Sequence, residues 1–164
     1  MIGGVHHNAY RCRDSEETRH FYEGFLGLPL AAAQDANASY GDGKADALHT
    51  FYQLGNGSYL AFFEAPAMPF DFKAQHVFDL HIALEVSMAV LHEMFEKGKS
   101  LGIETRGIAD HGCVHSIYFR DPNGYLIELT AKTPEHDREL DPACNGARER
   151  LERWQAEKPH SLRS

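Results

Sequence analysis

The stretches HNAYRC (residues 7–12) and HIALEV (residues 81–86) decide the fold, because they open two copies of one repeating unit. Each begins with a histidine and then alternates large apolar or β-branched residues with others, which is typical of a strand. A helical stripe of apolar residues follows, and fourteen residues separate the opening histidine from a stripe phenylalanine, Phe21 or Phe95, in both copies. Strand and helix therefore recur at a constant offset of 74 residues.

Start and stop signals predict a helix after each of these strands. Asp14 stands at the N-cap position of the first helix, with Glu17 three residues later. The predicted apolar stripes are Phe21, Tyr22, Phe25 and Leu26 in the first copy, and Val90, Leu91, Met94 and Phe95 in the second. A Leu-Gly pair closes both helices, as expected for a left-handed glycine cap.

Short strand-like runs follow each helix, in TFYQLGNGSYLAFFE (residues 50–64) and SIYFRDPNGYLIELT (residues 116–130). Asn56-Gly57 and Asn123-Gly124 mark matching hairpin turns at an offset of 67 residues. The first module is therefore about seven residues longer than the second. We place this insertion in residues 33–47, AQDANASYGDGKADA, as a polar loop that contains glycine.

The predicted fold class is α+β, because one helix precedes each group of three strands. We expect two βαβββ modules, at about residues 1–66 and 76–133, that form a half-open mixed sheet around a metal cleft. Together they make one domain, residues 1–133, and residues 134–164 form a C-terminal extension with one helix. That helix spans residues 142–157, and we expect its stripe of Ala147, Leu151 and Trp154 to dock on the domain or on a partner subunit.

Composition narrows the class of partner. A chain of 164 residues with 43% hydrophobic and 24% charged residues is typical of one soluble globular domain. A net charge of −8 argues against nucleic acid and anionic membranes, which favours a small-molecule partner. Three cysteines without a CxxC pair indicate reduced thiols. No secretory signal or membrane-spanning run is visible, so we expect a cytoplasmic protein.

Three residues form a candidate metal site. His7 and His81 occupy equivalent strand positions in the repeat, and Glu128 places a carboxylate in the otherwise apolar strand YLIEL. Burial of this carboxylate without a partner would cost several kcal/mol. Two imidazoles and one carboxylate match a non-haem Fe(II) site with open coordination positions, and Mn(II) fits too. The alternative is that each histidine is a hydrogen-bonded structural residue.

These residues resemble the vicinal-oxygen-chelate superfamily, which includes glyoxalase I, fosfomycin- and bleomycin-resistance proteins and type I extradiol dioxygenases. The resemblance covers about Val5 to Thr133, with HHNAYRCRDSEETRHFYEGFLGL, HIALEV and DPNGYLIEL as the matching stretches. HGCVHSIYFRDPNGYLIE (residues 111–128) resembles the extradiol dioxygenase signature. This resemblance implies that Glu128 is a metal ligand, that Tyr118 contacts the substrate and that His111 is a polar or acid/base group at the pocket mouth.

Single positions of this sequence distinguish it from particular members of the superfamily. Glyoxalase I has a carboxylate ligand where this chain has Ala61, which implies a site with three protein ligands. Glu64 lies three residues on, so strand alternation turns it to the other face unless a bulge intervenes. Two departures from the dioxygenase pattern are Ala109 and the lack of a histidine in residues 64–75. The further candidate pocket residues are Glu64, Ala61, Phe51, His115 and His49.

Our first hypothesis is a metal-dependent dioxygenase-like enzyme acting on a catechol or similar chelating small molecule. The alternatives are a glyoxalase-type lyase, isomerase or epimerase with Glu128 as the base, and a non-catalytic, resistance-type binding protein. The alternative for Tyr118 is a packing role in its strand, and the alternative for His111 is a solvated loop residue. Fe(II) is the expected metal, with Mn(II), Zn(II) and Ni(II) as alternatives. Exposed sheet edges favour a homodimer.

Overall fold

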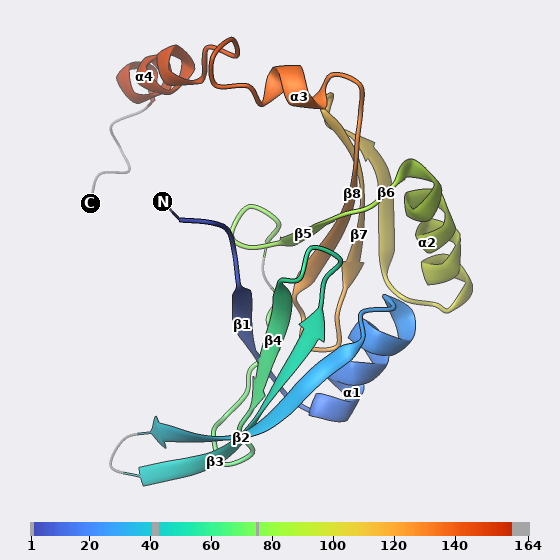
Figure 1. Ribbon diagram of the computed structural model, residues 1–164, viewed down its shortest axis with the longest axis vertical. Helices are drawn as coiled ribbons and strands as arrows, with labels where there is room; N and C mark the ends of the chain where they lie inside the picture. Colours follow the sequence, from blue (N-terminus) through green and yellow to red (C-terminus); the bar gives the residue numbers. More distant parts are fainter. Residues whose placement is uncertain (1, 41–42, 75, 159–164) are drawn as a thin grey trace. The chain divides into compact units, whose positions relative to one another are not determined.

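A computed structural model describes residues 2–40, 43–74 and 76–158 of the chain, and only the backbone of residues 37–40 and 43–45 (Figure 1). The chain divides into two compact units. Unit 1 comprises Met1–Ile82 and Phe119–Ile127, and unit 2 comprises Ala83–Tyr118 and Glu128–Ser164. The tip of the last hairpin therefore belongs to unit 1, whereas Glu128, the residue that follows it, belongs to unit 2.

The predicted α+β fold with two βαβββ modules is confirmed. The first module contains β1 (His7–Cys12), α1 (Ser15–Arg19), the π-helix η1 (His20–Phe25), β2 (Leu30–Tyr40), β3 (Gly43–Gln53) and β4 (Tyr59–Glu64). The second contains β5 (Ile82–Glu85), α2 (Met88–Ser100), β6 (Thr105–Asp110), β7 (Val114–Arg120) and β8 (Leu126–Lys132). The two four-stranded sheets have equivalent orders, β1-β4-β3-β2 and β5-β8-β7-β6, so the repeat in sequence is a repeat in topology.

The helix signals of the first module act as expected at both ends. The Asp14 carboxylate accepts a hydrogen bond from the Glu17 backbone N–H at 2.8 Å, which caps α1. The helix then widens in η1, where the Leu26 N–H donates to the carbonyl of Phe21, five residues earlier, at 2.9 Å. Gly27 ends the helix with a φ of 77°, and Gly102 ends α2 in the same way with a φ of 69°.

Aromatic side chains hold this helix against one face of the first sheet. Tyr22 of η1 is fully buried, and its ring centroid lies 4.6 Å from that of Phe62 and 5.5 Å from that of Tyr52. Phe62 on β4 and Tyr52 on β3 point to the helix side, so the residues that alternate with them point to the opposite face. Because Ala61 alternates with Phe62 and pairs with Ala9, that opposite face is the one that carries His7.

The predicted loop at residues 33–47 is wrong. Apart from residues 41 and 42, which lie outside the described residues, this stretch forms the long arms of β2 and β3. The two strands pair antiparallel from Leu30 and Tyr52 out to Tyr40 and Gly43. Alanines alternating with short polar residues give little β propensity of their own, but the pairing of the two arms satisfies the backbone hydrogen bonds of both.

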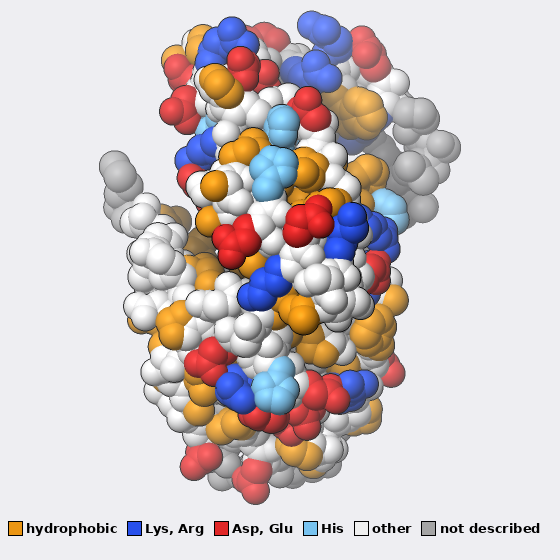
Figure 2. Space-filling view, turned by 90° about the vertical axis from the view of Figure 1, so that its right-hand side faces the viewer, with side chains coloured by type: hydrophobic (Ala, Val, Ile, Leu, Met, Phe, Trp, Pro, Cys, Tyr) orange, Lys and Arg blue, Asp and Glu red, His pale blue; other side chains and the backbone are white. Residues whose placement is uncertain are grey.

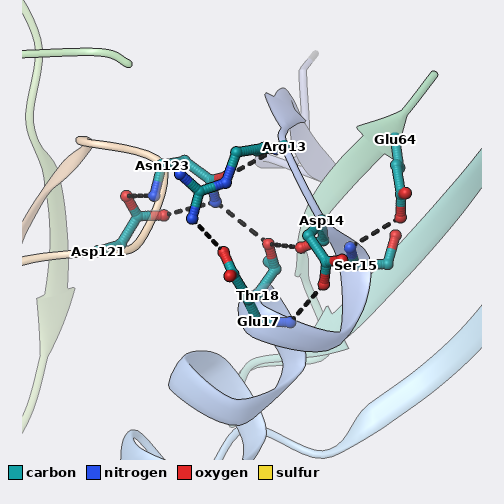
Figure 3. Close-up of polar contacts among 8 residues, drawn as sticks. All are labelled: Arg13, Asp14, Ser15, Glu17, Thr18, Glu64, Asp121 and Asn123. Atoms are coloured by element: carbon teal, nitrogen blue, oxygen red, sulfur yellow. Dashed lines mark hydrogen bonds and ion pairs between the residues drawn. The ribbon is translucent and has the colours of Figure 1, made fainter. Parts of the chain in front are cut away.

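A buried polar network fixes the tip of the β7–β8 hairpin to the first helix within unit 1 (Figure 3). The Asn123 side-chain oxygen accepts the Arg13 backbone N–H at 2.8 Å, and its amide donates to the Thr18 hydroxyl at 3.2 Å. The same amide donates to Asp121 at 3.1 Å, and the Tyr22 hydroxyl donates to Asp121 at 3.0 Å. Burial raises the pKa of Asp121, although its hydrogen bonds lower it. We call Thr18, Tyr22, Asp121 and Asn123 the hairpin latch.

Unit 2 also contains α2 and the C-terminal extension. Ser87 caps α2, and Leu91 and Met94 are buried as expected, whereas Val90 of the predicted stripe is 40% exposed. The extension contains the short helix α3 (His136–Glu139) in addition to the expected one, which is α4 (Ala147–Glu157). No residue of α4 is buried, so its apolar stripe does not pack on the described part of this chain.

The surface around the helices is of mixed charge. Figure 2 shows acidic and basic side chains interspersed on one face of the molecule, with no large area of a single sign. On the first helix, Arg19 pairs with both Glu16 and Glu23, and Arg13 pairs with Glu17. Within the described residues, no helix combines the length and apolar character that crossing a membrane requires.

Candidate functional site

His7 opens β1 and lies beside other aromatic rings of the first sheet. Its Nδ1 is 2.8 Å from Nδ1 of His6, so one of the two rings donates a hydrogen bond to the other. When His7 is the donor, its Nε2 carries the lone pair that a metal requires. The His7 ring centroid lies 5.6 Å from that of Phe51 and 6.2 Å from that of His49.

His81 stands immediately before β5 and is held by a backbone carbonyl. Its Nδ1 lies 2.8 Å from the carbonyl oxygen of Val77. A carbonyl only accepts hydrogen bonds, so Nδ1 carries the proton and Nε2 carries the lone pair. This is the arrangement by which proteins orient metal-binding histidines. Sequence reasoning did not identify Val77, because any residue type offers a carbonyl at that place.

His49 and Phe51 lie on β3, on the same face as His7. The His49 ring stacks on Phe63 with the centroids 3.7 Å apart and the planes 13° apart. Its centroid is also 4.1 Å from that of Phe51. Burial lowers the pKa of His49, and the nearby His7 lowers it further, which favours a neutral imidazole.

Neither Ala61 nor Glu64 on β4 adds a metal-binding oxygen beside His7. Ala61 is completely buried and carries no donor atom. Glu64 pairs with Cys12 on β1, and no register shift occurs along β4, so its side chain alternates away from the His7 face. Its carboxylate accepts the Ser15 backbone N–H at 2.7 Å at the start of α1 (Figure 3). The carboxylate thus serves the positive end of the helix.

Three candidate residues form a hydrogen-bonded chain within unit 2. Glu128 on β8 is only 6% exposed, and the Tyr118 hydroxyl on β7 donates to its Oε1 at 3.3 Å. His111 follows β6, and its Nε2 lies 2.9 Å from the Tyr118 oxygen. Because the phenol proton is directed at Glu128, His111 is the donor in the second hydrogen bond. The chain therefore runs from His111 through Tyr118 to Glu128.

The electrostatics keep Tyr118 protonated. Burial raises the pKa of Tyr118, and the negative charge of Glu128 raises it further. A phenol in this state is a hydrogen-bond donor at neutral pH. His115, also on β7, is not part of the chain; its Nε2 lies 3.7 Å from the Asp110 carboxylate.

The candidate ligands are thus divided between the two units. His7 and His81 belong to unit 1, and Glu128 belongs to unit 2. Among the described residues, neither unit by itself groups three His, Cys, Asp or Glu side chains suited to hold an ion. The donor types fit a divalent metal, since imidazole nitrogens and a carboxylate are its usual ligands.

Residues 4–129 match the model of the Glyoxalase/Bleomycin resistance protein/Dioxygenase superfamily. The match covers well over half of the chain, and the repeat, fold and strand order agree with it. The protein therefore belongs to this superfamily, whose members include glyoxalases, bleomycin resistance proteins and dioxygenases.

Solved structures share the fold at low sequence identity. The fosfomycin resistance protein FosX from Listeria monocytogenes is 22% identical with a TM-score of 0.62, over 86% of this chain and 100% of that one. A glyoxalase/dioxygenase from Nostoc punctiforme is 20% identical with a TM-score of 0.60, over 80% of this chain and 92% of that one. One structure, of a mutant of the Listeria protein, contains Mn(II) and 1S,2S-dihydroxypropylphosphonic acid.

Proposed function

We propose that this protein is a divalent-metal-dependent enzyme that opens the ring of an aromatic diol with molecular oxygen. The observation that carries the proposal is the chain of hydrogen bonds from His111 through Tyr118 to Glu128, which links the proposed ligand carboxylate to two hydrogen-bond donors. The Mn(II) found in the Listeria relative supports a metal in this protein as well.

The proposed metal ligands are His7, His81 and Glu128, and Fe(II) is the proposed ion, with Mn(II), Zn(II) and Ni(II) as alternatives. When bound, the ion would hold two adjacent substrate oxygens and lower their pKa. The placement of Glu64 at the start of α1 supports three protein ligands rather than the four of a glyoxalase-type site. Open coordination positions then remain for the diol.

The three residues of this hydrogen-bonded chain would orient the substrate and control its protons. We infer that the Tyr118 phenol, held between His111 and Glu128, donates a hydrogen bond to a substrate oxygen once the diol competes with Glu128. His111 would keep the phenol oriented through the hydrogen bond from its Nε2 to the Tyr118 oxygen. Replacing the phenol by phenyl removes both hydrogen bonds.

The test is anaerobic loading with Fe(II), followed by oxygen uptake and product absorbance with a panel of catechols. We expect oxygen uptake with at least one diol, and a kcat about a hundredfold lower for Tyr118→Phe. The matched control is Tyr10→Phe, a tyrosine on the opposite face from His7, which should keep the wild-type rate. Metal binding without oxygen uptake on any diol would contradict the proposal and favour a glyoxalase-type reaction. Ligand binding with no metal requirement would favour a resistance-type binding protein.

We also propose that the protein is a homodimer, because each four-stranded sheet ends, within the described residues, in two edge strands, and such edges are commonly covered by a partner. Light scattering coupled to size exclusion should give twice the mass of one chain. The mass of a single chain at micromolar concentration would contradict this.

A further inference from the structure

An aromatic surface lies beside His7 on the first sheet. It consists of His49 and Phe51 on β3 and Tyr59 and Phe63 on β4, and we call it the aromatic wall. The strand pairing brings these side chains together, because His7 pairs with Tyr59 and His49 pairs with Phe63. The whole wall belongs to unit 1.

The rings of the wall are fixed by one another. Phe63 supports the flat face of His49 at 3.7 Å, and Phe51 contacts His49 with the centroids 4.1 Å apart. Phe51 also meets Tyr59 edge to face, at 6.0 Å and 90°. Edge-to-face and stacked pairs of this kind stabilise a defined ring orientation. The wall is therefore a preformed surface against which a flat ring can pack.

The next feature of the wall is a polar atom of His49. The Nε2 atom of His49 is buried and has no hydrogen-bond partner among the described residues. An unpaired buried polar atom typically costs about 1–3 kcal/mol, and such atoms in native proteins are few. A phenylalanine would stack on Phe63 equally well without this cost. The missing partner of this nitrogen would then be a polar atom of a bound molecule.

The wall carries no positive charge that would select an anionic ligand. The neighbours of His7 on the same face, Ala9 and Ala61, are small and neutral. Arg11, further along β1, directs its guanidinium to the carbonyls of Ala65 and Met68 at 3.5 and 3.4 Å. A phosphonate group on this wall would therefore meet no arginine or lysine among the wall residues, whereas such groups are usually bound by these side chains.

We infer that the aromatic wall is the subsite for the substrate ring, and that His49 determines specificity by hydrogen bonding a polar substituent of an uncharged aromatic diol. This inference rests on the proposed function, since it places the ring next to the proposed ligand His7. It also distinguishes this protein from the Listeria relative, whose structure holds an aliphatic diol phosphonate.

The experiment measures binding rather than turnover, by anaerobic calorimetry on the full chain loaded with Mn(II). The two probes are 3,4-dihydroxybenzyl alcohol, an uncharged catechol with a polar substituent, and 1S,2S-dihydroxypropylphosphonic acid. We expect the wild type to bind 3,4-dihydroxybenzyl alcohol at least tenfold more tightly than the phosphonate. His49→Phe keeps the stacking ring and should bind Mn(II) like the wild type but 3,4-dihydroxybenzyl alcohol about tenfold more weakly. The control His20→Phe, an exposed histidine of η1, should change neither affinity.

The outcomes separate this inference from the proposed function. Unchanged 3,4-dihydroxybenzyl alcohol affinity in His49→Phe, or tighter binding of the phosphonate by the wild type, overturns the inference and leaves the metal site intact. A loss of Mn(II) affinity in His49→Phe equal to that of His81→Ala also overturns it, because His49 would then act on the ion. Failure of the wild type to bind Mn(II) overturns the proposed function, and the inference with it.

Discussion

Replacement of Asn123 by alanine should destabilise the protein by about 3 kcal/mol. Asn123 is 1% exposed, and its side chain makes three hydrogen bonds, with Arg13, Thr18 and Asp121, at 2.8, 3.2 and 3.1 Å. Each such bond contributes about 1 kcal/mol net, and the partners that stay buried lose their pairing. The loss is therefore several times larger than for an ordinary surface change.

The assay is urea unfolding followed by far-UV circular dichroism, with the free energy of unfolding extrapolated to water. The matched control is Asn56→Ala, at the equivalent hairpin turn of the first module, because Asn56 is exposed and its side chain hydrogen bonds, among the described residues, only with Ser58. We expect the control to lose less than about 1 kcal/mol. Equal losses in the two variants would refute the role of the hairpin latch, since both share the effect of an Asn-Gly turn.

Three further predictions concern the same unit. Gly124→Ala should lower the free energy of unfolding more than Gly57→Ala, measured by urea unfolding, because both have positive φ but only at Gly124 would a Cβ lie 2.6 Å from the backbone N of Lys73. Burial raises the pKa of Asp121 above its ordinary value of 3.8, so the folded state favours the protonated carboxyl. The stability that this preference adds is fully present below the ordinary pKa and is lost as the pH rises through the raised one. The stability advantage over Asp121→Asn should therefore shrink from pH 3 to pH 7, and an advantage that grows would contradict this. Glu64→Gln should cost about 1 kcal/mol at the start of α1 yet leave Mn(II) affinity unchanged, and a lost affinity would make Glu64 a ligand.

The fold could be predicted from the sequence because its signals are local and occur twice. The Asp14 cap, the closing glycines and the two Asn-Gly turns each depend on a few neighbouring residues, and the repeat supplied the register between them. The arms of β2 and β3 were missed because their strand character comes from pairing with each other rather than from β-branched residues.

The residue types of the candidate site could be proposed from the sequence, and they stay a prediction, whereas their contacts could not. The histidines and Glu128 were identified from repeat position and from a charge in an apolar strand. The same holds for the hairpin latch, where the hydrogen bond between Tyr22 and Asp121 joins residues 99 positions apart and no local pattern indicates it. The unpaired Nε2 of His49 likewise depends on what surrounds the ring in three dimensions.

The most direct test of the metal centre is anomalous diffraction from crystals of the protein soaked in Mn(II). We expect one ion bonded to Nε2 of His7, Nε2 of His81 and a carboxylate oxygen of Glu128. An ion bound elsewhere, or an ion that contacts only one of these three side chains, would contradict the account.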